Sequence, residues 1–96
     1  MLQKTLVKSK GAYKVKFTLK LDNAETVEVL GLNNDWETPV SLSKKKDGSF
    51  STEVTLPKDS KHEFKYRVNN NEWLTEDDAD AQEPNGFGST NSVLIL

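Results

Sequence analysis

The stretch YKVKFTLKL, residues 13–21, alternates strictly between apolar and polar side chains. Successive side chains of a β-strand point to opposite sides, so a period of two is typical of a strand with one buried face. A helix would need an apolar stripe at i, i+3 and i+4, and none is present here. The stretch therefore predicts a half-buried strand. Its predicted buried face carries Tyr13, Val15, Phe17, Leu19 and Leu21.

Further segments carry the same kind of strand signal, with turn residues between them. They are residues 26–30, 40–43, 50–56, 62–68, 72–74 and 92–96. Asp47-Gly48 and Asn69-Asn70-Asn71 predict tight turns, because glycine and asparagine tolerate positive φ angles. No segment carries a convincing helix signal. About seven short strands at regular turn spacing predict an all-β, immunoglobulin-like β-sandwich.

The 96 residues are the length of one domain. Residues 1–12 are basic and weakly patterned, so we expect an N-terminal arm or a segment that adds along a sheet edge. Residues 13–96 form the predicted immunoglobulin-like domain. Within it, residues 75–90 are polar and acidic and contain Gly and Pro, which predicts a long loop that is functional or mobile.

Composition excludes several classes of protein. Thirteen basic and fifteen acidic residues give a net charge of -2, which provides no attraction for nucleic acid or an anionic membrane. The absence of cysteine excludes disulfides, thiol catalysis and thiolate metal sites. The N-terminus lacks the features of a signal peptide, and residues 93–96, the longest apolar run, are too short to span a bilayer. We expect a soluble, cytoplasmic protein.

Catalytic and metal chemistry find little support in the sequence. His62 is the only histidine, no serine or cysteine motif accompanies it, and a surface or turn histidine is the simpler interpretation. An EF-hand register beginning at Asp78 places Glu83 where glycine is required and Ser89 where the bidentate glutamate is required. No glycine-rich phosphate loop is present. We interpret the acidic residues near Asp78 as a solvated loop, with a weak calcium site as the alternative. We expect no enzyme, no catalytic residue, no cofactor and no metal site.

A set of aromatic and polar side chains remains. Trp36 lies in a polar loop and Trp73 follows the asparagine turn, while Lys65 points outward from a predicted strand and Asn91 follows Phe87. A sugar ring has an apolar C–H face and a rim of hydroxyls, which suits flat aromatic surfaces with nearby ammonium or amide groups. The competing interpretation places either tryptophan in the sandwich core, with Lys65 solvated and Asn91 in a turn or cap.

Several motifs occur in one order along the chain. They are Gly31-x-x-Asn34-x-Trp36, Asp47-Gly48-Ser49-Phe50, Leu56-Pro57, Glu63-Phe64-Lys65-Tyr66-Arg67-Val68 with Trp73 five residues on, and Phe87-Gly88-Ser89-Thr90-Asn91-Ser92-Val93. Together they resemble the isoamylase early-set domains, carbohydrate-binding module family 48. That family includes the glycogen-binding domain of the AMP-activated protein kinase β subunit and the N-terminal domains of branching and debranching enzymes. The similarity covers Tyr13 to Leu96 and implies an early-set immunoglobulin-like sandwich.

The resemblance also implies site residues. Carried over by position, the stacking tryptophans are Trp36 and Trp73, and Lys65 matches a lysine that reaches sugar hydroxyls. The residues that match contacts in a later loop are Phe87, Ser89 and Asn91.

This sequence departs from the family pattern at two positions. Asn33 stands where the family usually has phenylalanine, which bears on the support of Trp36. Asn70-Asn71 replaces the usual Asp-Gly turn before the second tryptophan.

The expected function is that of a non-catalytic module that binds an α-1,4-linked glucan such as glycogen, starch or a maltooligosaccharide by aromatic stacking. We expect a monomer or a weak homo-oligomer. The alternative is a protein-interaction module with a degenerate sugar site. Such a module would dock a glucan-metabolising enzyme through the Tyr13–Leu21 edge or the Thr75–Asn85 loop. Single-stranded nucleic-acid binding would need a basic groove that the composition does not support.

Overall fold

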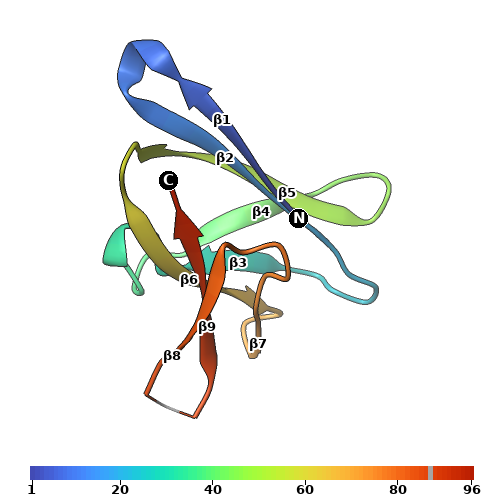
Figure 1. The fold of residues 1–96 in the computed structure, drawn as a ribbon. Helices are drawn as coiled ribbons and strands as arrows, with labels where there is room; N and C mark the ends of the chain where they lie inside the picture. Colours follow the sequence, from blue (N-terminus) through green and yellow to red (C-terminus); the bar gives the residue numbers. More distant parts are fainter. Residues whose placement is uncertain (87) are drawn as a thin grey trace.

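The computed structural model describes residues 1–86 and 88–96, which form nine strands and two short 3-10 turns (Figure 1). The strands are β1 (Leu2–Val7), β2 (Ala12–Lys20), β3 (Val27–Leu30), β4 (Val40–Lys44), β5 (Ser49–Pro57), β6 (Lys61–Val68), β7 (Glu72–Leu74), β8 (Ala81–Pro84) and β9 (Thr90–Ile95). The 3-10 turns are η1 (Lys8–Lys10) and η2 (Leu32–Asn34). Across the described residues, no helix has the length and apolar character needed to cross a membrane.

The strands form one antiparallel sheet that curls into two facing layers (Figure 1). The hydrogen-bonded order is β1-β2-β5-β4-β3-β6-β9-β8, and β7 pairs with β6 beside this path. Strand β4 pairs with β3 and with β5, so it connects the β1-β2-β5 layer to the β3-β6-β9-β8 layer. The predicted fold class, an all-β, early-set immunoglobulin-like sandwich, is confirmed.

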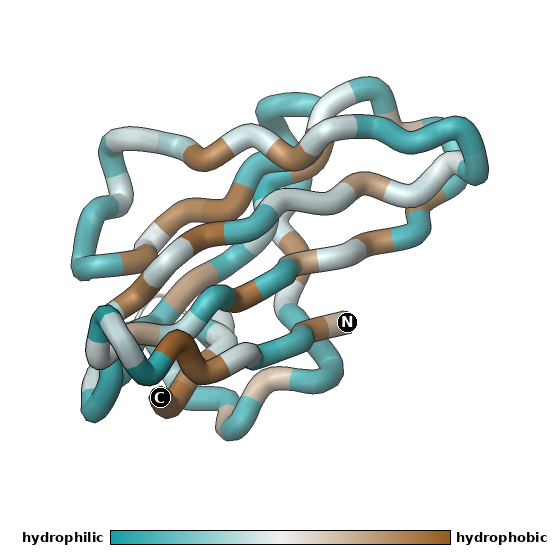
Figure 2. Tube along the Cα trace, turned by 90° about the horizontal axis from the view of Figure 1, so that it is seen from above, coloured by the Kyte–Doolittle hydropathy of each residue, from teal (hydrophilic) through white to brown (hydrophobic). Residues whose placement is uncertain are grey.

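Three aromatic rings join the two layers at the centre of the core. Phe17 of β2 packs edge-on against Phe64 of β6 with ring centroids 5.4 Å apart, and Tyr66 contacts both rings at 6.4 and 5.8 Å. Each ring is fully buried, and burying such a side chain contributes about 1.5–3 kcal/mol. Figure 2 shows hydrophobic and hydrophilic residues alternating along the strands, as the period of two predicts.

Strands β1 and β8 lie outside the seven predicted segments. Strand β1 pairs with β2 from Leu2 opposite Phe17 to Val7 opposite Ala12, so β2 is bonded on both sides and is not the exposed edge that the sequence suggested for docking. The prediction of one continuous loop over residues 75–90 is also wrong, because β8 pairs with β9 within it. Ala81–Pro84 has little intrinsic strand preference, and its pairing with β9 overrides that local signal.

Glu76 lies in the predicted solvated acidic segment, yet it is only 2% exposed. Its Oε1 accepts hydrogen bonds from the Tyr66 hydroxyl at 2.8 Å and the Met1 amino group at 2.9 Å, and Oε2 accepts one from the Asp78 N–H at 3.0 Å. Burial alone would raise the pKa of Glu76, but these hydrogen bonds outweigh burial and lower it. The carboxylate therefore ties the segment after β7 to the core.

Replacing Glu76 with alanine should lower the free energy of unfolding by about 1–3 kcal/mol, because the buried Tyr66 hydroxyl would lose its acceptor. Urea denaturation monitored by tryptophan fluorescence measures this change. Adding Tyr66→Phe to Glu76→Ala should recover part of the loss, since the unsatisfied hydroxyl is then removed. Wild-type stability in Glu76→Ala would contradict this role.

Candidate functional site

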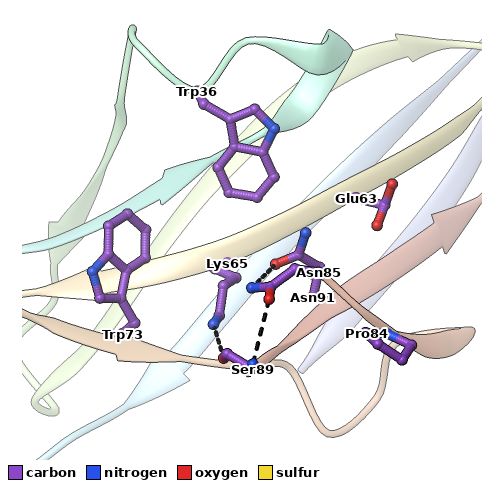
Figure 3. A pocket seen from close by; sticks show the side chains of 8 residues that line it. All are labelled: Trp36, Glu63, Lys65, Trp73, Pro84, Asn85, Ser89 and Asn91. Atoms are coloured by element: carbon purple, nitrogen blue, oxygen red, sulfur yellow. Dashed lines mark hydrogen bonds between the residues drawn. The ribbon is translucent and has the colours of Figure 1, made fainter. Parts of the chain in front are cut away.

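One open groove of about 700 Å³ lies on the outer face of β6 (Figure 3). The side chains that line it are Trp36, Glu63, Lys65, Trp73, Pro84, Asn85, Ser89 and Asn91. Five of the six predicted site residues are thus brought together, from three separate parts of the chain. The sixth, Phe87, lies outside the described residues. Their binding roles remain predictions, whereas their shared location is a property of the fold.

Both tryptophans are on the surface of the groove. Trp36 is 37% exposed and Trp73 is 46% exposed, so neither belongs to the sandwich core. The competing interpretation, a core tryptophan, is therefore wrong for both. Large exposed aromatic surfaces cost free energy in water, and two of them in one hollow make it a candidate binding site.

The loop before Trp36 is shaped by residues that tolerate positive φ. Gly31 has φ +104°, and Asn33 and Asn34 have φ values of 57° and 61°. Asp35 then closes the turn, since its Oδ1 accepts hydrogen bonds from the N–H groups of Thr38 and Glu37, at 3.0 Å each. These hydrogen bonds lower the pKa of Asp35, and the one from Thr38 has the largest effect. The local sequence therefore determines the turn that carries Trp36.

Gly31 lies directly beneath the Trp36 ring. A Cβ atom at Gly31 would clash with the carbonyl oxygen of Glu63 and would lie 2.7 Å from Cζ2 of Trp36. The missing side chain thus lets the indole edge approach the backbone of β6 closely. This contact explains why the first position of the motif is glycine.

His62 holds this loop in place through a hydrogen bond. This role was not identified from the sequence. His62 is 5% exposed, not a surface residue as predicted, and its Nδ1 accepts a hydrogen bond from the Asn33 N–H at 3.0 Å. On the other side of the ring, Nε2 lies 2.8 Å from Ser60 Oγ. With Nδ1 as acceptor, the neutral ring carries its proton on Nε2 and donates it to Ser60. At Asn33 the bond uses a backbone N–H, so the side chain at this position takes no part in it.

Trp73 is supported from β6. It lies opposite Arg67 in the β6–β7 register, and the Arg67 guanidinium carbon is 5.8 Å from the centroid of the indole. Glu28 Oε1 holds that guanidinium by accepting hydrogen bonds from Nε at 3.1 Å and Nη2 at 2.9 Å. A cation above an aromatic face is attracted by the ring quadrupole. The stacked guanidinium therefore supports one face of Trp73.

Polar groups lie between the indoles and the loop before β9. Lys65 is only 8% exposed, and its Nζ donates a hydrogen bond to Ser89 Oγ at 2.6 Å. The sequence placed Lys65 on the outer face of β6, but it is covered and not solvated. Asn91 Oδ1 accepts from Asn85 Nδ2 at 3.3 Å (Figure 3). No carboxylate of the described chain forms an ion pair with Lys65, so two of its three ammonium hydrogens are available to a ligand.

Glu63, Pro84 and Asn85 also line the groove, although the sequence did not single them out. The alternation along β6 places Glu63 on the same face as Lys65, which was a usable signal. Pro84 and Asn85 reach the groove only through the β8–β9 pairing. Among residues 1–86 and 88–96, no group of three or more His, Asp or Glu side chains could hold a metal ion.

Residues 13–96 match the family described as the glycogen recognition site of AMP-activated protein kinase. The chain belongs to this family. The family is one of carbohydrate-binding modules, which are generally non-catalytic, and this membership agrees with the resemblance read from the motifs. It makes the chain a module of the glycogen-recognition type.

No curated protein matches the chain. Among solved structures, the crystal structure of ferric enterobactin esterase from Salmonella typhimurium superposes with a TM-score of 0.78 at 10% identity. The superposition covers 99% of this chain and 34% of the esterase, so the chain spans about a third of that protein. At this identity the likeness shows the fold alone.

The His62 anchor makes stability depend on pH in a defined direction. Burial lowers the pKa of His62 from its ordinary value of 6.5, so the unfolded chain takes up a proton before the folded chain does. Stability should therefore be full above pH 6.5 and should fall as pH drops from there towards the lowered pKa. The charged neighbours along the strand are Lys61, which is paired with Glu83 at 2.8 Å, and Glu63.

Urea midpoints at pH 7.5 and 5.5 measure this dependence. We expect a drop for the wild type and a smaller one for His62→Asn, whose amide oxygen accepts from the Asn33 N–H without titrating. The same drop in both proteins would show that His62 is not the titrating group.

Proposed function

We propose that the groove binds α-1,4-linked glucan by stacking glucose units on Trp36 and Trp73. Lys65 and Asn91 would hydrogen-bond the hydroxyl rim, and Ser89 would hold the lysine in place. The observation that carries this proposal is that two exposed indoles line one groove with a covered ammonium, which forms no ion pair among the described residues. The part assigned to Phe87, covering the outer side of the sugar, rests on the family resemblance.

The expected affinity is weak. Aromatic stacking contributes about 0.5–1.5 kcal/mol per contact beyond area burial. Ordering a flexible oligosaccharide opposes binding, and the groove leaves the sugar partly hydrated. These magnitudes predict dissociation constants between roughly micromolar and millimolar, or about -8 to -4 kcal/mol.

The alternative, a protein-interaction module that docks a glucan-metabolising enzyme, has less support. In its expected docking edge, Tyr13–Leu21, residues 13–17 are paired on both sides, with β1 and β5. In its other expected surface, Thr75–Asn85, Glu76 is buried, and β8 is paired with β9 on one side and ends the sheet order on the other. Five of the predicted sugar-binding residues line one groove, which favours sugar binding.

Isothermal titration with maltoheptaose and β-cyclodextrin tests the proposal. Trp36→Ala and Trp73→Ala should each weaken binding by at least about tenfold, which corresponds to about 1.4 kcal/mol. Neutral sugars form no ion pairs, so binding should change little between low and high salt.

Ile95→Ala is the matched control, because Ile95 is an exposed large apolar residue (51%) that does not line the groove. It should bind as the wild type does. Thermal unfolding of each variant confirms that the fold is retained. If both tryptophan variants bound these sugars as tightly as the wild type, the groove would not be the sugar-binding site.

A further inference from the structure

The groove extends past the two indoles to an end formed by Glu63 and Pro84 (Figure 3). Trp73 lies opposite Arg67, and Glu63 lies four residues before Arg67 on the same face of β6. At about 3.3 Å per residue, this face spans about 13 Å between the two positions. A ligand that reaches from Trp73 to Glu63 must therefore contain several sugar units.

The position of Glu63 is tied to that of Trp36. Gly31 touches both, because a side chain on it would meet the Glu63 carbonyl oxygen and the Trp36 ring. The Glu63 side chain also lines the groove, so a sugar unit that leaves Trp36 towards this end can reach it. Pro84 and Asn85, at the end of β8, are the other side chains at this end (Figure 3).

The chemistry of this end differs from that of the middle of the groove. Lys65 offers hydrogen-bond donors, whereas an ionised carboxylate such as that of Glu63 is an acceptor with two oxygens. Glu63 is half-buried, and no cation of the described chain forms an ion pair with it. Lys61, the next outward residue on β6, donates to Glu83 at 2.8 Å. The Glu63 carboxylate is therefore available to two ligand hydroxyls.

Pro84 adds an apolar surface at the same end. Its ring is exposed and carries no hydrogen-bond donor. An apolar surface beside a polar group is the general combination that suits a sugar ring, here with an acceptor where Lys65 supplies donors. A sugar with an anionic substituent would instead meet the negative charge of Glu63 in a partly dehydrated groove.

We propose that Glu63 and Pro84 form a further glucose subsite, which accepts a neutral unit of the glucan and rejects one that carries an anionic group. This inference rests on the proposed function, because it extends the same groove. It predicts that affinity rises with chain length until a unit reaches Glu63. It also predicts selectivity for unmodified glucan over phosphorylated glucan.

Titrations of maltose through maltoheptaose against wild type and Glu63→Ala test the first prediction. Glu63→Ala should lose about tenfold in affinity for maltoheptaose, the scale of a charge-assisted hydrogen bond, and the loss should be smaller for maltose, which is too short to reach from Trp73 to Glu63. Glu53→Ala is the matched control, an exposed glutamate on β5 that is not part of the groove. Equal binding of maltoheptaose by wild type and Glu63→Ala would overturn the subsite.

Glu63→Gln tests the role of charge, because it keeps the side-chain size and one acceptor oxygen. The ratio of affinities for phosphorylated and unmodified maltoheptaose should rise at least about fivefold in this variant. An unchanged ratio would overturn the selectivity. If the wild-type protein bound no maltooligosaccharide, both the proposed function and the further subsite would be contradicted. Wild-type binding that Trp73→Ala weakens and Glu63→Ala does not would end the subsite alone.

Discussion

The alternation of side chains along β6 couples the core of this protein to its groove. Phe64 points inward and packs on Phe17 of the facing layer at 5.4 Å, while Lys65 and Arg67 are on the outer face. A slip of one residue would exchange the two faces, so core packing determines the register of the strand. The same packing therefore determines which side chains face the groove.

Different interactions hold each of the two indoles on this outer face. The Trp36 ring packs against Gly31, which has no side chain. The loop that carries Trp36 is held by a hydrogen bond from the backbone N–H of Asn33 to His62. Trp73 lies on a three-residue strand, where the Arg67 guanidinium stacks on its ring. Separate supports allow the groove to be open and still hold its aromatic surfaces in place. The sugar binding that we propose would gain from this, because the cost of ordering side chains opposes binding.

The residues that sequence reasoning misjudged share a cause. Glu76 is a polar residue in a polar segment, and nothing local distinguishes it from solvated neighbours. His62 lies two residues before Phe64 on β6, so the period of two pointed it inward, but nothing local showed what would cover it. His62 is buried because the Asn33 loop, 29 positions away, covers it, and Glu76 is buried because Tyr66 and Ser92 meet it. Strand β8 likewise exists through its pairing with β9. The burial of His62 and Glu76 and the formation of β8 each depend on a contact between distant parts of the chain. Composition and periodicity carry no information about such contacts.

The sequence by itself determined the all-β class, the inward and outward faces of β2 and β6, and the turns at Asp47-Gly48 and Asn69-Asn70. These follow from side-chain period and backbone preference, which act within a few residues. Motif order also indicated the family and most of the candidate site. Only the tertiary structure decided that both tryptophans lie outside the core, that Lys65 is covered, and that Glu63 and Pro84 complete the groove. The physical reason is that burial depends on which distant strands meet, and that is set by the packing of the two layers as a whole.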